Sequence, residues 1–485
     1  MQNSEKIWTL VDARREAYEA LSDRIWEMPE LAYGEYRSAA EHRQMLEREG
    51  FRVEENLAGI PTAVMGEAGA GGPVIAILGE YDALPGLSQV AGIAEQRELE
   101  ASGNGHGCGH NLLGSAALLA AAAVKDYLAA QGIKGRVRYY GCPAEEGGAA
   151  KTFMVRAGQF QDVDIAITWH PGAMNRVDDA VSLANTRIDF TFKGRASHAA
   201  AAPHLGRSAL DAVELMNVGV NYMREHMPSD ARIHYAVVDA GGIAPNVVQA
   251  TATVRYAVRA RDLPGMRALV ERVTNVARGA ALMTETQMSQ RIVSAVSNLL
   301  GNTPLEEAMQ RHLEHLGPPP FDGADRKYAT EIQATLTAED IASAYARAGV
   351  APRAATPLCD FVVPLGTRGA PMMASTDVGD VSWVVPTVQA RVATCAIGTP
   401  GHSWQITAQG KSGQAKKGMV AAAKVMGSLA VEALEDAALI ARAKADLEAR
   451  TEALPYRCPL PADAQPPIEP RSTPAGGDSS RPTPV

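Results

Sequence analysis

The sequence has little that would suit a membrane protein, a secreted protein or a nucleic-acid-binding protein. A transmembrane helix requires about 18 uncharged apolar residues in a row, and the longest apolar run, residues 112–124, is shorter and rich in alanine. The first residues show no basic segment followed by an apolar core, so we expect no secretory signal. A net charge of −9 gives no electrostatic reason to expect nucleic acid or an anionic membrane as a partner.

Cysteine is also scarce, and its pattern bears on the cellular compartment. The five cysteines are odd in number and irregularly spaced: Cys108, Cys142, Cys359, Cys395 and Cys458. This pattern in a large chain is typical of reduced thiols and not of a disulfide framework, so we expect a cytoplasmic protein.

A chain of 485 residues is too long for one ordinary hydrophobic core, so two domains are expected. Residues 1–184 form the first part of the larger domain. After a helical stretch at 7–50, buried strands alternate with a long helix: strands at 73–78, 135–140 and 163–168, and the helix at 111–131. The alternation predicts an α/β domain with a mainly parallel sheet.

The pattern changes after residue 184. Residues 185–296 follow the order strand, helix, strand, strand, helix, strand, which predicts a small inserted α+β (ferredoxin-like) domain. Residues 297–455 resume the larger domain, although 317–352 show no clear pattern. Residues 456–485 are rich in proline, serine and glycine, which predicts a disordered tail or a strap over the surface.

Side chains that can bind a metal occur at four separate turns. They are Cys108 and His110 between glycines, the pair Glu145-Glu146 before two glycines, His170 before a proline, and His402 after a glycine. Asp82, the glutamate pair and His170 each follow a predicted strand, where open α/β sheets bind their ligands. Each motif alone has a structural interpretation: a buried cysteine with a capping histidine, solvated glutamates, a core histidine. Together they predict a metal site, and the glutamate pair indicates hydrolysis.

Several common active-site motifs are missing from the chain, which narrows the chemistry. The sequence contains no G-x-G-x-x-G, H-E-x-x-H or G-x-S-x-G motif and no zinc-deaminase P-C-x-x-C pattern beside the Cys108 segment. A dinucleotide site and a serine nucleophile of the usual type are therefore not expected.

The chain resembles the M20 metallopeptidase/aminoacylase family over about residues 7–460. The matching segments are 79–84 (GEYDAL), 104–114 (NGHGCGHNLLG), 140–143, 145–148, 151–156, 203–213, 245–249 and 374–383. The resemblance implies an α/β catalytic domain that binds two divalent metal ions, with an inserted domain that serves dimerisation and covers the site. Asn111 stands where many relatives carry aspartate. The aminobenzoyl-glutamate branch of the family also has asparagine there, so this residue indicates that branch.

The resemblance also implies the roles of individual residues. The metal ligands fall on Cys108, His110, Glu146, His170 and His402. Glu145 falls on the general base, and Asp82 on a carboxylate that orients a ligand histidine. Cys108 would bridge the two ions as a thiolate, which suits Zn²⁺, although enzymes of this type often use Mn²⁺.

Three residues of the inserted domain complete the site by resemblance. His198 would help to stabilise the oxyanion, Asn246 would bind polar substrate groups, and Arg259 would bind the substrate carboxylate. His198 and Asn246 would come from a partner chain of the assembly. On the residues alone they read as a surface histidine, a turn asparagine and a solvent-facing arginine.

The implied activity is hydrolysis of an N-acyl amino acid with an aromatic acyl group, with p-aminobenzoyl-glutamate as the leading example. One alternative is an aminoacylase for an indole-acetyl or benzoyl conjugate. Another is a non-catalytic assembly component of a heteromeric hydrolase. The expected assembly is a homodimer through the inserted domain, and pairing with a companion chain is the second option.

Overall fold

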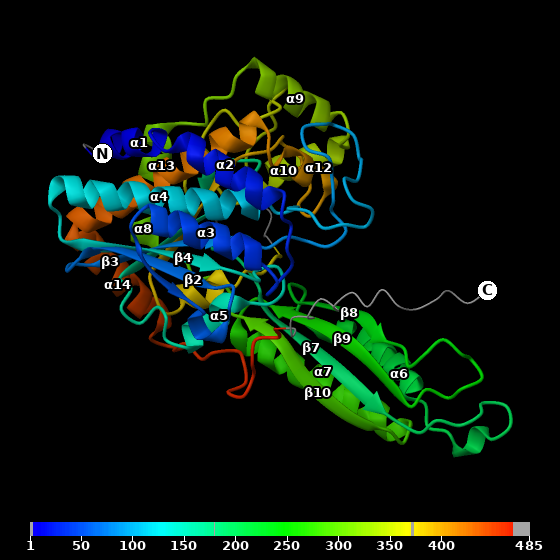
Figure 1. Ribbon diagram of the computed structural model, residues 1–485. Helices are drawn as coiled ribbons and strands as arrows, with labels where there is room; N and C mark the ends of the chain where they lie inside the picture. The colour runs from blue at the N-terminus through cyan, green and yellow to red at the C-terminus, as the bar shows by residue number, and fades with distance from the viewer. Residues whose placement is uncertain (1–2, 179, 370–372, 469–485) are drawn as a thin grey trace, which may run out of the picture.

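The computed structural model describes residues 3–178, 180–369 and 373–468. The chain forms two units, each built around its own sheet (Figure 1). The second unit lies between two parts of the first along the sequence, as the change of pattern after residue 184 predicts.

The larger unit contains a seven-stranded sheet in the order β1-β2-β4-β3-β5-β11-β6. Its strands are β1 (Arg52–Glu55), β2 (Val64–Ala70), β3 (Val74–Glu80), β4 (Gly135–Cys142), β5 (Ile165–Gly172), β6 (Arg176–Val177) and β11 (Thr387–Ala393). The four central strands β4, β3, β5 and β11 are parallel, whereas the outer strands pair antiparallel. The predicted α/β class with a mainly parallel sheet is confirmed.

Helices cover both faces of this sheet, because side chains of a buried parallel strand alternate between two apolar layers. The helices of the larger unit are α1 (Ser4–Asp12), α2 (Arg15–Trp26), α3 (Tyr36–Arg48), α4 (His110–Gln131), α5 (Ala150–Arg156), α8 (Thr303–Leu316), α9 (Gly323–Gln333), α10 (Ala338–Ala348), α11 (Val378–Ser382), α12 (Trp404–Gln409), α13 (Gly413–Glu435) and α14 (Ala437–Thr451). Ile75 and Ile77 of β3 face the layer with α4 and α13, whereas Ala76 and Leu78 face α5 and α11.

The central helix α4 begins at the metal-binding motif. Its first residue is His110, and Gly109 before it adopts φ = 78°, a left-handed conformation that glycine adopts without strain. The helix is long and apolar enough to cross a membrane, but 83% of its most apolar window is buried inside the protein. Because it packs against α1, α2, α13 and β3, α4 is the core helix of the larger unit.

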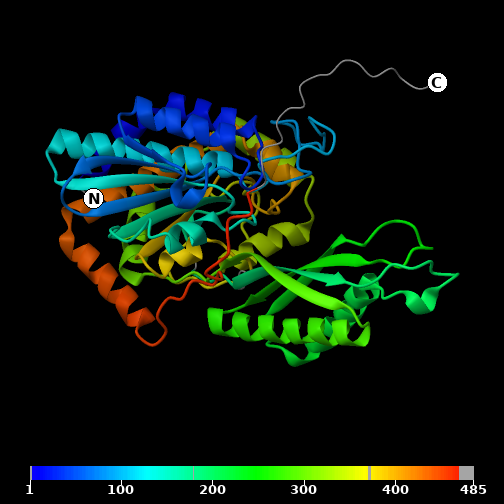
Figure 2. The same ribbon diagram turned by 60° about the horizontal axis from the view of Figure 1, so that its bottom comes forward.

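The second unit is a four-stranded antiparallel sheet in the order β10-β7-β9-β8. Its elements are β7 (Ala184–Lys193), α6 (Ala209–Met223), β8 (Arg232–Asp239), β9 (Thr251–Ala260), α7 (Leu263–Met283) and β10 (Gln287–Val296). The two helices cover one face of the sheet (Figure 2). The predicted order of elements is confirmed, and the residue boundaries of the domains stay a prediction.

Three segments differ from the sequence reading or sharpen it. The stretch 317–352 contains α9 and α10.

Strand β5 continues through His170 and Pro171 to Gly172, because β11 pairs with β5 along this whole stretch. These residues therefore lie inside the strand and not after it. The described part of the tail, residues 456–468, forms a strap: Tyr456 Oη donates to Asp380 at 2.8 Å, and Arg156 donates to the carbonyl oxygens of Pro461 and Ala464. Residues 469–485 lie outside the described chain.

Candidate metal centre

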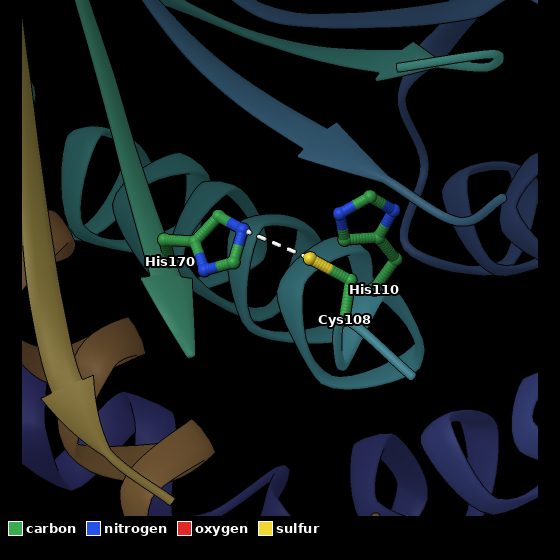
Figure 3. A group of neighbouring side chains, drawn as sticks. All are labelled: Cys108, His110 and His170. Carbon is green, nitrogen blue, oxygen red and sulfur yellow. Dashed lines mark hydrogen bonds between the residues drawn. The ribbon is translucent and has the colours of Figure 1, made fainter. Parts of the chain in front are cut away.

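The predicted metal-binding side chains converge at the carboxyl ends of the central strands. Cys108 and His110 lie at the start of α4, and His170 lies near the end of β5. The Cys108 sulfur is 3.5 Å from Nε2 of His170 and lies between the two imidazoles (Figure 3). Cys108, His110 and His170 each offer one ligand atom within 4.8 Å of the others.

A second group of three completes the centre and shares its thiol with the first. Cys108, Glu146 and His402 also bring one ligand atom each within 4.8 Å of one another. His402 Nε2 lies 3.3 Å from Oε2 of Glu146. All five residues that the sequence suggested as ligands are therefore in one place, with Cys108 common to both groups.

The loop that carries His402 is attached directly to the Cys108 turn. The His402 N–H donates to the carbonyl oxygen of Gly107 at 3.0 Å. His402 has φ = 54°, a left-handed conformation that is rare for a residue with a side chain and that tends to persist at functional sites. A Cβ on Gly107 would overlap the end of the Leu87 side chain, which would have to move to admit it.

Asp82 connects the two groups from behind. Its Oδ1 accepts a hydrogen bond from Nδ1 of His110 at 2.8 Å, and its Oδ2 accepts the N–H of Glu146 at 2.8 Å. The first contact engages Nδ1 of His110, so Nε2 is the ring nitrogen that faces the centre and would bind a metal. The orienting role expected of Asp82 stays a prediction.

The residues present fit a pair of divalent cations. Nε2 of His110 and Oε1 of Glu146 are buried, lack any hydrogen-bond partner in the described structure and lie 4.0 Å apart. Unpaired buried polar atoms are costly unless a ligand or ion satisfies them. A thiolate, three imidazoles and a carboxylate form a donor set that suits Zn²⁺ and related transition metals.

Electrostatics prepare Cys108 to act as a thiolate. Burial by itself raises the pKa of the thiol, but the imidazoles of His170 and His110 outweigh that effect, and the pKa lies well below the usual value. The neighbouring His402 has its pKa raised to about 10 by hydrogen bonds to Cys108 and Glu146. A Cys108 thiolate therefore lies among imidazoles whose protonated form it favours.

Glu145 lies beside the centre on a strained turn. The residues that flank its segment, Ala144 and Ala149, both have left-handed backbones at φ = 56° and 57°. Burial and the nearby carboxylates of Glu80 and Glu146 raise the pKa of Glu145 well above its usual value. A half-buried carboxylate with a raised pKa is suited to accept and return a proton.

Behind this turn lies a buried ion network that the sequence reading did not single out. Lys151 Nζ lies 2.6 Å from Oε1 of Glu80 and 2.6 Å from Oδ1 of Asp377, and all three side chains are buried. The other Glu80 oxygen lies 3.3 Å from Nε2 of His110. Nothing in the local sequence marks Lys151 as buried, because lysine is normally a surface residue.

The three predicted residues of the second unit do not all reach the centre of their own chain. His198 and Asn246 are exposed and adjacent, with Ala199 N–H donating to the Asn246 carbonyl at 2.9 Å. His198 lies after the end of β7 and Asn246 before the start of β9, at the opposite end of the sheet from Arg259. The part of β9 between Thr251 and Arg259 alone spans about 26 Å, at roughly 3.3 Å per strand residue. Arg259 lies at the near end, where its Nη1 donates to Ser375 Oγ at 3.4 Å.

Arg187 is a site residue that the sequence reading missed. It lies on β7, and its Nη2 donates to the Glu146 carbonyl at 3.2 Å. A Cβ on Gly147 would overlap Nη1 of Arg187, so the guanidinium packs directly over the glutamate turn. Its position inside a strand gave no signal, since strand arginines usually face water.

Comparisons with known proteins agree with this arrangement. Residues 76–338 match the model of peptidase family M20/M25/M40. The chain is 46% identical over 466 residues, which are 94% of its length, to the B subunit of p-aminobenzoyl-glutamate hydrolase from Escherichia coli, covering 97% of that protein. It is 29% identical over 48% of its length to the A subunit of the same hydrolase, covering 54% of that protein.

A solved structure shows the same fold. A dinuclear metal-binding peptidase of the M20 family from Bacillus subtilis superimposes with a TM-score of 0.55 at 18% identity, over 87% of this chain and 99% of that one. This chain belongs to peptidase family M20/M25/M40 and is a metal-dependent amidohydrolase.

Proposed function

We propose that this chain hydrolyses the amide bond of N-acyl amino acids with an aromatic acyl group, and that p-aminobenzoyl-glutamate, which gives p-aminobenzoate and glutamate, is its substrate. The observation that carries the proposal is the pair of ligand groups that share Cys108 beside the half-buried Glu145. The relative that is 46% identical over nearly the whole chain supports the choice of substrate.

Cys108, His110, Glu146, His170 and His402 would hold two divalent ions, either Zn²⁺ or Mn²⁺. Such ions lower the pKa of a water molecule and polarise the scissile carbonyl group. Asp82 would hold the His110 ring so that Nε2 faces the centre. The unpaired atoms of His110 and Glu146 support this assignment.

Glu145 would move the proton. In this proposal the carboxylate accepts a proton from the attacking water and then donates it to the nitrogen of the leaving amino acid. Its raised pKa, caused by burial and by Glu80 and Glu146, suits a group that accepts a proton and later returns it. The turn that carries Glu145 is fixed on one side by Glu35, whose Oε1 accepts the Ala144 N–H at 2.9 Å.

His198 and Asn246 would act on the centre of a second chain, His198 on the oxyanion and Asn246 on polar substrate groups. Their distance from the centre of their own chain supports this arrangement. Strand β8 is the edge of the small sheet and exposes apolar side chains, with Tyr235 41%, Val237 48% and Val238 54% exposed. Because an apolar edge strand invites pairing with another strand, we propose a homodimer through β8.

Pairing with a companion chain is the second option for the assembly, and it is supported by the likeness to both components of the Escherichia coli hydrolase. The same strand edge would then pair with that companion. The five cysteines, all without a disulfide partner, support the cytoplasm as the compartment.

The test is hydrolysis of p-aminobenzoyl-glutamate by the purified chain alone, first stripped of metal and then resupplied with Mn²⁺ or Zn²⁺. We expect release of glutamate only after metal is restored, with light scattering showing a dimer. Benzoyl and indole-acetyl conjugates are assayed beside it. Faster turnover of one of those conjugates would show that its acyl group, and not p-aminobenzoyl, is the preferred one. No turnover of any conjugate with both ions bound would favour a non-catalytic assembly role.

A further inference from the structure

The second unit presents a row of cationic side chains toward the glutamate turn. Asn185 of β7 pairs with Arg259 of β9, and Arg187 pairs with Ala257. Residues directly opposite each other share a face of an antiparallel sheet, so Arg187 and Arg259 are diagonal neighbours on one face, with Cβ atoms about 7–8 Å apart. Arg187 touches the turn of Glu145 and Glu146 through the Glu146 carbonyl group.

These two arginines differ from the third arginine of the same face. Arg255 is paired, with Nε 2.7 Å from Oδ1 of Asp189. In the part of the chain that the structure describes, no carboxylate lies within ion-pair distance of Arg187 or Arg259. Nε of Arg259 is buried without any hydrogen-bond partner. Two half-buried guanidinium groups are thus left beside the centre with donors to spare.

We propose that Arg187 and Arg259 together form a binding site for an amino acid with two carboxylates, Arg259 taking the α-carboxylate and Arg187 the side-chain carboxylate. The inference rests on the proposed amidohydrolase function and adds to it the residue that selects an acidic amino acid. Arg187 is then a specificity-determining residue, distinct from the residues that hold metal or move protons.

The physical basis is the cost of unpaired charge in a partly desolvated place. The two guanidinium groups are half-buried neighbours of like charge, and Nε of Arg259 is buried without a hydrogen-bond partner. A dianionic ligand relieves this repulsion and offers each planar guanidinium a bidentate partner. An amino acid with a neutral side chain leaves the Arg187 guanidinium unpaired, and the site discriminates against it for that reason.

The experiment compares two substrates of the same shape, p-aminobenzoyl-glutamate and p-aminobenzoyl-glutamine, in the metal-loaded enzyme. In Arg187→Met we expect kcat/KM for the glutamate compound to fall on the order of 10- to 100-fold, mainly through KM, since a charge-assisted hydrogen bond is lost. The glutamine compound is expected to change less than about threefold. Arg187→Lys keeps the charge without the planar fork and restores part of the preference.

Arg255→Met is the matched control, because it removes a cation from the same sheet face that already has a carboxylate partner. It is expected to leave the ratio of the two kcat/KM values unchanged. An equal fall for both substrates in Arg187→Met would show that Arg187 only supports the glutamate turn, and would overturn the proposal. If Arg255→Met lowers the ratio of the two kcat/KM values as much as Arg187→Met does, the proposal is overturned as well.

A binding measurement separates this inference from the proposed function. Calorimetry with L-glutamate and L-glutamine is carried out on the metal-loaded wild type and on Arg187→Met. If the wild type cleaves neither p-aminobenzoyl compound, the proposed substrate is wrong, and the preference for glutamate over glutamine still decides the role of Arg187. Equal affinity for both amino acids in the wild type would overturn the inference even if p-aminobenzoyl-glutamate is hydrolysed.

Discussion

The N–H of Glu146 donates to Oδ2 of Asp82 at 2.8 Å, while the other oxygen of this carboxylate accepts a hydrogen bond from His110 at 2.8 Å. One buried carboxylate thus sets the positions of a residue from each ligand group. The side-chain oxygen of an asparagine at position 82 can accept the hydrogen bond from His110. Its NH2 group then faces the Glu146 N–H, and because both groups are donors, this second hydrogen bond is lost.

Asp82→Asn is therefore expected to lower metal affinity about 10- to 100-fold. The measurement is competition with a chelator of known affinity. Asp380→Asn is the control, since Asp380 is also a buried carboxylate that accepts a backbone N–H, from Ser297 at 2.9 Å, but does not touch the centre. Unchanged affinity in Asp82→Asn would contradict the orienting role.

Glu145→Gln should abolish turnover and leave the metal in place. Glutamine keeps the size of the side chain but cannot accept and return the proton, so kcat is expected to fall by about two to four orders of magnitude. Metal content by mass spectrometry should equal that of the wild type, because Glu145 is not one of the five proposed ligands. Full activity in this variant would remove Glu145 from the mechanism.

Cys108→Ala should release metal, since its sulfur is common to both ligand groups. We expect metal content well below that of the wild type, and activity to be lost with it. Cys458→Ala is a suitable control: its thiol is also free and half-buried, but it lies on the strap after α14. Retention of both ions in Cys108→Ala would contradict the proposed bridging role of Cys108.

Lys151→Met is expected to destabilise the fold. Lys151 is fully buried between the carboxylates of Glu80 and Asp377, and removing one member of a buried ion cluster typically costs about 3–5 kcal/mol. The free energy of unfolding in urea is the measurement. Lys424→Met, which breaks a surface pair with Asp12, should cost less than about 1 kcal/mol. Similar losses in the two variants would contradict the structural role of Lys151.

Glu35 predicts a pH dependence of stability. Burial, and then the charge of Asp82, raise the pKa of Glu35 from 4.5 to about 8. Between these values the folded state keeps a proton that the unfolded state has lost, so the stability of the wild type falls as pH rises through this window.

Glu35→Gln lacks this titration, and its amide oxygen can still accept the N–H groups of Tyr33 and Ala144. Between about pH 6 and 8, the free energy of unfolding of the variant minus that of the wild type should increase by roughly 1.4 kcal/mol per pH unit. Urea unfolding of both proteins across this range gives the comparison. Parallel pH curves would mean that Glu35 is already ionised in the folded protein at pH 6.

Much of the fold was readable from the sequence because its signals are local. The apolar run of β3 and the alanine-rich α4 have patterns that few other structures fit, and the alternating strands of the second unit show which face is buried. The metal-binding residues could also be named, since cysteine, histidine and paired glutamates at glycine-rich turns are unusual. The predicted strand at 163–168 ends too early, because pairing with β11 extends β5 to Gly172 and this pairing is not local.

The kind of chemistry could be inferred from the residues alone: the donor atoms, the glutamate pair that indicates hydrolysis, and the α/β scaffold that brings strand ends together. Which of these residues meet depends on the tertiary structure. It placed Cys108 in both ligand groups, buried Lys151 between two carboxylates, held Arg187 over the glutamate turn and put His198 and Asn246 at the far end of the small sheet. These relations depend on contacts between residues far apart in the chain, where burial and charge are set by neighbours that no local pattern encodes.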